Sequence, residues 1–308
     1  KIGTSFHRWV KENTKLLKLK SEENYYYFVK SDFVFYSDLY IRIKKMERYP
    51  TSGFEIVNYI TNYSVATSLS YPLYLSAISK TDSEEEINDK ILIVANFIER
   101  YVILKSILNQ PISQTSIRYS FFNTIIKEIR DLSVQELENS FKTYLNQYDE
   151  AYEEIRNINT YNSNRKFLKY FVSRITMYVD NLCDYKTDFY DLITARRKSG
   201  SNVSHLLKDS DKQKFNSDDV FYNVATNIGA IALLRKDIDY IDESETNVLY
   251  RILNNGSLSD SEIQVLSKKF NLPNINEVGI EWLIENQSFI IEICEELWKN
   301  SSLKNENM

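Results

Sequence analysis

The sequence is poor in the residues that interrupt secondary structure, with only 6 Gly and 4 Pro among its 308 residues. Sheet-and-turn architectures place Gly and Pro at many tight turns, so this scarcity disfavours an all-β fold and favours long helices. The two cysteines, Cys183 and Cys294, are too few and too far apart for a disulfide framework. Cys294 falls within an apolar helical pattern, which predicts a buried free thiol. A reducing, cytoplasmic compartment fits this cysteine usage.

Long apolar runs, excess positive charge and histidine are also scarce. No apolar run approaches the length of a transmembrane helix and no signal peptide is visible, so we expect no membrane association. The formal net charge of -5 lacks the global basic signature of a nucleic-acid coat, although basic clusters can lie on an acidic protein. Of the two histidines, His7 lies beside Trp9 in an amphipathic pattern and is interpreted as structural. His205 is therefore the histidine to consider for function.

Apolar residues at helical spacing are abundant, and hydrophobic residues make up 43% of the chain. This is enough for a sizeable core and predicts a mainly α fold. The segment 91–108 is nearly apolar on three sides, which predicts a central helix of a bundle. Ser133 with Glu136 and Ser259 with Glu262 form the spacing of capping boxes, and Asp82 is expected to cap the helix that follows it.

The character of the sequence changes after Cys183. Helical periodicity weakens, and short segments rich in Ser, Gly, Asn and Asp continue to about Ile241. A strong apolar stripe returns over residues 290–298. We therefore predict a helical bundle domain over residues 1–185. Residues 186–308 are predicted to form a second domain, a small α+β region packed with closing C-terminal helices.

Six segments occur in the order found in one family. They are SDLYIRI, NYSVATSLSYPLYLSAISKTD, INDKILIVANFIERYVILKSILNQ, IRYSFFNTIIKEIRDLSVQELENSF, NSNRKFLKYFVSRITMYVD and IEWLIENQSFIIEICEELWKN. The ordered set resembles prokaryotic defence proteins of the GmrSD type, which are modification-dependent restriction enzymes and their relatives. Their plan is a ParB-like nucleotide-binding domain, a helical middle and a C-terminal nuclease domain of the HNH (His-Me finger) class. The resemblance covers most of the chain.

The chain departs from this family plan in two places. The Asp-Gly-Gln-Gln-Arg signature of the ParB-like domain is absent, and the resemblance implies that this domain precedes Lys1 or lies on a separate polypeptide. In the nuclease domain, VSHLL aligns with the family phrase VEHI, so His205 takes the place of the catalytic histidine and Ser204 that of the glutamate. Downstream, NIGAIALLRKDID aligns with iGgLlLLPksfN and puts Asp239 in the place of a metal-binding asparagine. The resemblance thus implies an HNH-like (ββα-metal) region with altered partner residues.

The implied chemistry is hydrolysis of a phosphodiester. A neutral histidine takes a proton from the attacking water, and one divalent cation stabilises the developing charge. The carboxylate of Asp239 is an oxygen ligand that suits Mg²⁺ or Mn²⁺. Loss of the glutamate beside His205 removes an orienting group, which typically costs about 10–100-fold in metal sites. Further acids nearby are either substitute ligands or solvated loop residues: Asp209, Asp211, Asp218, Asp219 and Asp237.

Basic residues flank the His205 region, as a DNA channel requires. The candidate contacts are Arg196, Arg197, Lys198, Lys208, Lys212, Arg235 and Lys236, with Arg165, Lys166, Lys169, Arg174 and Lys214 as further members. The alternative for each cluster is a solvated helix face. Arg174 lies inside an apolar helical pattern, where an ion pair with a buried carboxylate is the competing interpretation.

Two functions remain open at this point. The first is a metal-dependent DNA endonuclease of a restriction or antiphage system, with His205 as base and Asp239 as metal ligand. The alternative is a nuclease-dead DNA-binding or regulatory subunit that docks a ParB-like nucleotide-binding partner. A purely structural helical scaffold, with His205 as an incidental surface residue, is a weaker third possibility.

Overall fold

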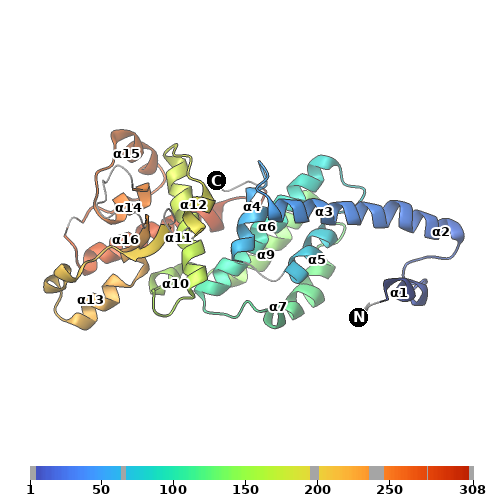
Figure 1. Ribbon diagram of the computed structural model, residues 1–308, viewed down its shortest axis with the longest axis horizontal. Coiled ribbons are helices and arrows are strands. Elements are labelled where there is room, and N and C mark those ends of the chain that lie inside the picture. Colours follow the sequence, from blue (N-terminus) through green and yellow to red (C-terminus); the bar gives the residue numbers. More distant parts are fainter. Residues whose placement is uncertain (1–4, 64–66, 195–200, 236–245, 276, 305–308) are drawn as a thin grey trace.

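The computed structural model describes residues 5–63, 67–194, 201–235, 246–275 and 277–304 and is mainly helical (Figure 1). The α-helices are α1 (Phe6–Glu12), α2 (Glu22–Tyr27), α3 (Val34–Arg48), α4 (Glu55–Tyr59), α5 (Thr67–Ala77), α6 (Glu84–Ile107), α7 (Gln114–Ser120), α8 (Ile126–Glu128), α9 (Val134–Leu145), α10 (Ala151–Glu154), α11 (Arg165–Leu182), α12 (Phe189–Ile193), α13 (Asp218–Ala225), α14 (Val248–Leu253), α15 (Asp260–Leu266) and α16 (Ile280–Cys294). Strands β1 (Ser201–His205) and β2 (Ile231–Arg235) form a two-stranded antiparallel sheet. The prediction of a mainly α fold with a small mixed region is confirmed in this coarse form.

Short π and 3-10 segments extend or join these helices. The π segments are η1 (Phe28–Phe33), η3 (Phe121–Ile125) and η9 (Glu295–Asn300). The 3-10 segments are η2 (Ile60–Asn62), η4 (Asn146–Tyr148), η5 (Ile155–Asn157), η6 (Asp209–Lys214) and η7 (Ile228–Ala230).

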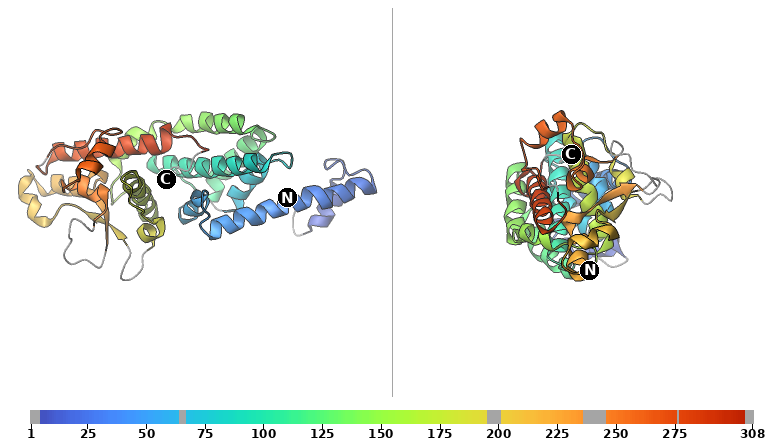
Figure 2. Two further views of the ribbon diagram at one scale, coloured as in Figure 1. Left: turned by 90° about the horizontal axis from the view of Figure 1, so that it is seen from above. Right: turned by 90° about the vertical axis from the view of Figure 1, so that its left-hand side faces the viewer.

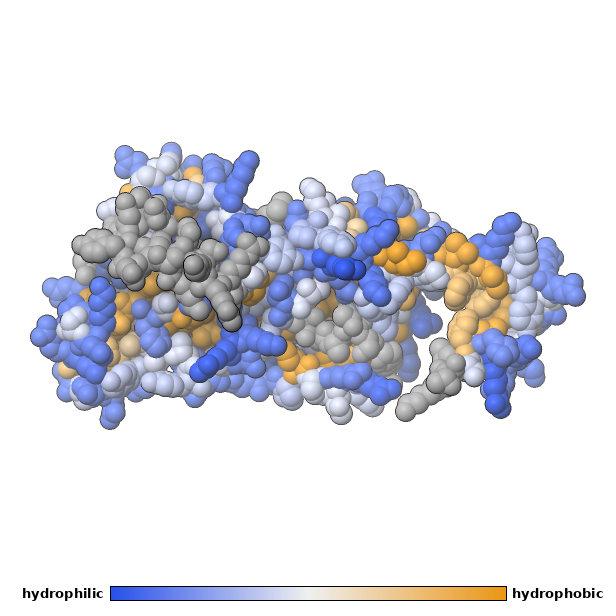
Figure 3. All heavy atoms as spheres, viewed as in Figure 1, coloured by the Kyte–Doolittle hydropathy of each residue, from blue (hydrophilic) through white to orange (hydrophobic). Residues whose placement is uncertain are grey.

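The molecule is elongated, with α1–α9 towards one end and α10–α16 with the sheet towards the other (Figures 1 and 2). Helix α2, segment η1 and helix α3 follow one another and project as an arm from the helical body (Figure 1). The arm carries exposed apolar side chains, and Figure 3 shows apolar surface in this part of the molecule. They include Tyr26, Tyr27, Val29, Phe33 and Val34. No helix within the described ranges is both long and apolar enough to cross a bilayer.

Helix α6 is the centre of the helical body, as the apolar segment 91–108 predicts. It contacts α4, α5, α9, α10 and α11, and its side chains are buried along most of its length. Phe97 of α6 stacks on Phe141 of α9 with ring centroids 4.0 Å apart. Burial on nearly all sides explains why this helix shows little polar face in the sequence.

The N-caps follow the sequence with one exception. Ser133 begins α9 and Ser259 begins α15, each in the predicted capping box. The prediction that Asp82 caps the next helix is wrong, because Ser83 is the N-cap of α6. The Asp82 carboxylate instead binds the ammonium group of Lys90 at 2.7 Å. A cap must reach the backbone N–H groups of the first turn, and Asp82 lies one residue too early for that.

Helix α11 joins the two ends of the molecule. It contacts α6 on one side and α14, α16, β1 and β2 elsewhere, and the buried apolar core is continuous from the helical body into the C-terminal part. The domain boundary at residue 185 therefore has no matching break in the core, and it stays a prediction. Cys294, on α16, is a buried free thiol as expected.

Arg174 of α11 is fully buried and forms an ion pair with Glu99 of α6. Its Nε donates to Glu99 Oε1 at 2.6 Å, and Tyr170 and Trp298 donate to the same carboxylate. Side-chain exposure is 2% for Arg174 and 1% for Glu99. The buried-carboxylate interpretation of Arg174 is thus confirmed, and this arginine is not available to DNA.

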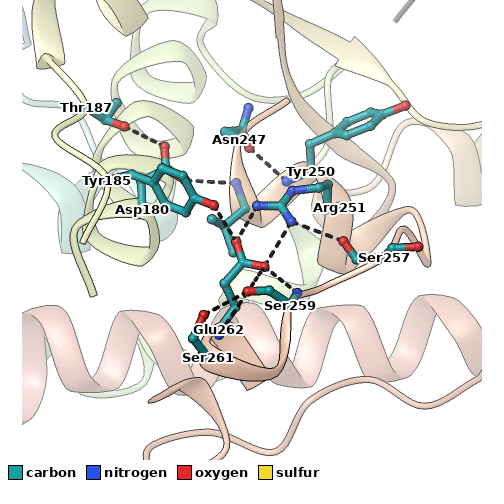
Figure 4. Close-up of polar contacts among 11 residues, drawn as sticks. Asp180, Tyr185, Thr187, Asn247, Tyr250, Arg251, Ser257, Ser259, Ser261 and Glu262 are labelled. Carbon is teal, nitrogen blue, oxygen red and sulfur yellow. Dashed lines mark hydrogen bonds and ion pairs between the residues drawn. The ribbon is translucent and has the colours of Figure 1, made fainter. Parts of the chain in front are cut away.

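A second polar network supports the C-terminal region (Figure 4). Arg251 of α14 forms a two-point ion pair with Glu262 of α15, with one N–O distance of 3.0 Å. Burial alone raises the pKa of Glu262, but hydrogen bonds from Arg251, Ser259 and Tyr185 outweigh it and lower the pKa to about 2. The network therefore holds α14 and α15 together with both partners charged at neutral pH.

Asp180, near the end of α11, belongs to the same network and gives a pH-dependent prediction. Its carboxylate accepts from Val248 N–H at 2.8 Å and from the Thr187 hydroxyl at 2.8 Å. Burial nevertheless raises the pKa of Asp180 from 3.8 to about 6. The folded state therefore binds more protons than the unfolded state between these two values. Ionised Asp180 opposes folding above that window by about 3 kcal/mol.

We expect Asp180→Asn to be more stable than the wild type at about pH 7, because the amide oxygen keeps the Val248 contact without the buried charge. The wild type should lose stability as pH rises from about 4 to 6, and the variant should lose less. Urea unfolding at several pH values measures how steeply the free energy of unfolding changes with pH in the wild type and in the variant. Asp191→Asn, at an exposed acid of α12, is the matched control and should keep the wild-type slope. An Asp180→Asn variant with the wild-type slope would contradict the assignment.

Candidate functional site

His205 is the last residue of β1 and lies at one end of the sheet. The register pairs it with Ile231, while Ser201 at the other end of β1 pairs with Arg235. Residues 231–233 of β2 are buried, and this strand packs on α11 and α14. The polar sequence of β1 has weak strand propensity, so pairing with the apolar β2 accounts for its conformation. His205 is exposed at the end of this pair.

The His205 ring is held by a contact from a distant segment. Its Nε2 lies 3.2 Å from Oγ1 of Thr160, in the connection between η5 and α11. Neighbouring atoms cover part of the ring, and this partial burial lowers the pKa of His205 below its ordinary value. The imidazole is therefore neutral at physiological pH, which is the state of a general base.

Backbone hydrogen bonds fix the segment that carries Thr160. The N–H of Thr160 donates to the carbonyl oxygen of Thr226, and the N–H of Ile228 donates to that of Ile158, both at 2.9 Å. Thr226 follows α13 and Ile228 begins η7, so the chain between β1 and β2 supports the residue that holds His205. None of this pairing is visible as a local sequence pattern.

The acids and lysines that follow β1 pair with one another. Lys212 binds Asp209 at 3.3 Å and Lys214 binds Asp211 at 2.8 Å, while the Lys212 ammonium also donates to the hydroxyl of Tyr222. Asp218 and Asp219 lie in the first turn of α13, where the helix dipole favours acids. Lys208, by contrast, is exposed at the start of η6 and available to a ligand. The local pairs favour the solvated-loop interpretation for Asp209 and Asp211.

Several predicted site residues lie outside the described residues: Arg196, Arg197, Lys198, Lys236, Asp237 and Asp239. Arg235 is the last residue of β2, and the register places its backbone at the far end of the sheet from His205. This separation is about 13 Å for strands of this length. The structure thus brings His205 together with Thr160, and it does not bring Arg235 to the histidine.

The described surroundings of His205 do not by themselves fit a divalent cation. Nowhere in the described ranges does a group of three or more His, Cys, Asp or Glu residues gather in a way that could hold a metal ion. Thr160 adds only a hydroxyl to the imidazole, whereas Mg²⁺ binds through carboxylates and other oxygens. Any cation site here would need ligands from elsewhere in the chain, such as Asp239.

An open polar cleft of about 370 Å³ is lined by both chain neighbours of Thr160, the residue that contacts His205. Asparagine side chains dominate its lining, and none of them is among the site residues predicted from the sequence. The available signal was the density of asparagine in NINTYNSN, residues 157–164. The cleft is lined by Asn157, Asn159, Tyr161, Asn162, Asn223, Thr226 and Asn227.

Two of these asparagines build the cleft, because their side-chain oxygens already accept hydrogen bonds from within the molecule. Asn159 Oδ1 accepts from the N–H groups of Tyr161 and Asn162, which fixes a tight turn. The Asn227 side chain donates to Arg156 O and accepts from Gly229 N–H and from Gln287 of α16. The base of the cleft is consequently tied to α16.

No protein-family model, curated protein or solved structure matches the chain. The resemblance to GmrSD-type proteins therefore stays a prediction.

Proposed function

We propose that the protein is a DNA-directed component of a prokaryotic restriction or antiphage defence system, with an HNH-like site at His205 that hydrolyses phosphodiesters. The position of His205 carries this proposal. The histidine ends β1, its ring is neutral at physiological pH, and its Nε2 is held by Thr160 beside an open cleft. The two strands pair with each other although η6, α13 and η7 lie between them along the chain, so the antiparallel pair itself is the part of the implied ββα-metal motif that supports the proposal.

In the proposed reaction, the neutral ring of His205 takes a proton from a water molecule that attacks the phosphorus of a phosphodiester. A new P–O bond forms, the bond to the leaving sugar oxygen breaks, and that oxygen is protonated from solvent. Thr160 keeps the ring in one orientation, and Ser204 lacks the carboxylate that the family glutamate would provide. Mg²⁺ or Mn²⁺ would stabilise the developing charge, and Asp239 is the ligand implied by the resemblance.

DNA contact in this proposal falls to basic side chains around the cleft and the sheet end. Arg165 and Lys166 are exposed at the start of α11, directly after the asparagine-rich segment, and Lys208 is exposed after β1. Lys169 is engaged within the molecule, since its ammonium donates to the carbonyl oxygen of Ser201. These three exposed cations, at the start of α11 and after β1, fit phosphate contacts that position a nucleic acid.

The alternative is a nuclease-dead DNA-binding or regulatory subunit that docks a ParB-like nucleotide-binding partner. Ser204 in place of the family glutamate favours it, as does the lack of a metal-binding group among the residues that the structure describes. The two functions differ in cleavage, and the alternative requires binding of DNA or of the partner.

Incubation of supercoiled plasmid with the protein and Mg²⁺ or Mn²⁺, followed by gel electrophoresis, tests the proposal. We expect nicked or linear plasmid with either cation and intact plasmid with EDTA. A gel-shift titration in EDTA at low and moderate salt measures binding. The affinity should fall as the salt concentration rises, because the protein releases counterions from DNA on binding and this release is less favourable at high salt. Salt-sensitive binding without cleavage under any cation supports the alternative. Absence of both DNA binding and cleavage contradicts the endonuclease, and the further absence of any co-purifying partner contradicts the alternative.

A further inference from the structure

The asparagine-lined cleft has the chemistry of a ligand site. Its lining contains five asparagines, one threonine and one tyrosine, and no charged side chain. A neutral lining disfavours a phosphate group, which proteins bind through cations and helix N-termini. The ligand part that enters this cleft is therefore polar and uncharged.

Three side chains of the cleft are available to such a ligand. Asn162 and Asn223 are exposed, and within the described part of the chain neither side-chain amide makes a hydrogen bond. Tyr161 is 73% exposed, although it stands next to a rigid turn. A large aromatic side chain so open to solvent offers its flat face to a binding partner.

Amide groups and an aromatic face together match a nucleobase. Each asparagine amide carries a donor and an acceptor, and this pair can match the edge of a base such as adenine. Bases that leave the stack pack on aromatic side chains in nucleic-acid-binding proteins. The rigid turn at Asn159 and the fixed Asn227 provide a preformed floor, so binding does not have to order the cleft.

We propose that the cleft binds an unstacked nucleobase, with its face on Tyr161 and its edge against the amides of Asn162 and Asn223. This inference rests on the proposed function and names the part of the nucleic acid that the site holds. Tyr161 directly follows Thr160, which contacts His205. In this proposal the cleft selects the nucleotide whose phosphodiester is presented to His205, because the stacking residue Tyr161 is the chain neighbour of the threonine that contacts the imidazole.

Fluorescence anisotropy with a labelled short single-stranded oligonucleotide in EDTA tests this inference on the full chain. We expect Tyr161→Ala to weaken binding by about 5- to 150-fold, the range of one lost base–aromatic stack. Tyr161→Trp should restore affinity, because the ring face is kept. The salt dependence should keep the wild-type slope in both variants, since a neutral side chain displaces no counterions.

The matched control is Tyr119→Ala, because Tyr119 of α7 is 75% exposed and lies in the other part of the molecule. It should bind as the wild type does. A double variant, Asn162→Ala with Asn223→Ala, should reduce the difference in affinity between oligonucleotides of different base composition.

The possible outcomes separate this inference from the proposed function. If the wild type binds and Tyr161→Ala binds equally well, the base site is overturned while DNA binding stands. If the wild type binds no oligonucleotide or duplex, the proposed function itself is overturned. Competition by a free monosaccharide, with none by nucleosides, would assign the cleft to a carbohydrate and overturn the base assignment.

Discussion

Replacing His205 with alanine is expected to lower the rate of plasmid cleavage by about 10²- to 10⁴-fold, the usual contribution of a positioned general base. Affinity for DNA in EDTA should stay at the wild-type value, because the ring makes no charged contact in its neutral state. The measurement is the initial rate of conversion of supercoiled to nicked plasmid with Mg²⁺ or Mn²⁺. Equal rates for the variant and the wild type would exclude His205 as the base.

His7→Ala is the matched control, since His7 is the second histidine of the chain and is exposed on α1. The His7→Ala variant should cleave at the wild-type rate. If only His205→Ala is inactive, the cleavage does not come from a contaminating nuclease. Thr160→Val should retain part of the activity, because it removes only the hydroxyl that orients the ring.

The pH dependence of cleavage gives a further readout of His205. Partial burial lowers the pKa of His205, so the neutral form persists to a lower pH than in free histidine. The midpoint of the acidic fall in rate should therefore lie below about pH 6.5, the ordinary value for histidine. A rate that already falls at higher pH would point to a different base.

Replacing Glu99 with alanine is expected to lower the free energy of unfolding by about 3–5 kcal/mol. The change leaves Arg174 buried without its counterion and removes the acceptor used by Tyr170 and Trp298. Burial lowers the pKa of Arg174, but Glu99 and Tyr170 outweigh this effect and raise it, so the guanidinium keeps its charge. Urea unfolding of the variant should show a lower midpoint with an unchanged slope.

A double-mutant cycle separates the charge pair from packing. Arg174→Met alone and Glu99→Leu alone should each destabilise as Glu99→Ala does, because each leaves one buried charge unpaired. The combination of Glu99→Leu with Arg174→Met should recover much of the loss, since apolar side chains of similar volume need no counterion. The control is Glu12→Ala in the exposed pair with Arg8, which should cost less than about 1 kcal/mol. A double variant as unstable as the single variants would assign the loss to packing.

Local sequence patterns predict the secondary structure well in this protein. The apolar segment 91–108 is the buried α6, and the serines at positions 133 and 259 begin helices as their spacing predicts. Helix caps and helix faces depend on residues within one or two turns of each other, so they are readable from sequence. The position of a cap is predicted only to within one residue, because Ser83 rather than Asp82 is the N-cap of α6. The Asp82 carboxylate pairs instead with Lys90, two turns further along the chain.

Contacts between distant segments could not be predicted in this way. The histidine was identified by its place in a sequence phrase, but its partner Thr160 is 45 residues away and carries no recognisable motif. The cleft combines residues 157–162 with residues 223–227, which α11, α12 and β1 separate along the chain. Asn162 and Asn223 form one site only because backbone hydrogen bonds join residues 158–160 to 226–228.

The sequence by itself determined the helical fold, the small number of turns and the singular position of His205, because composition and periodicity act over short distances along the chain. Only the tertiary structure decided that Arg174 belongs to Glu99 rather than to DNA, and that the neighbours of Thr160, the partner of His205, line a neutral cleft rich in asparagine. Which face of a helix is buried follows from its own residues, whereas the partner it meets there depends on how the whole chain packs.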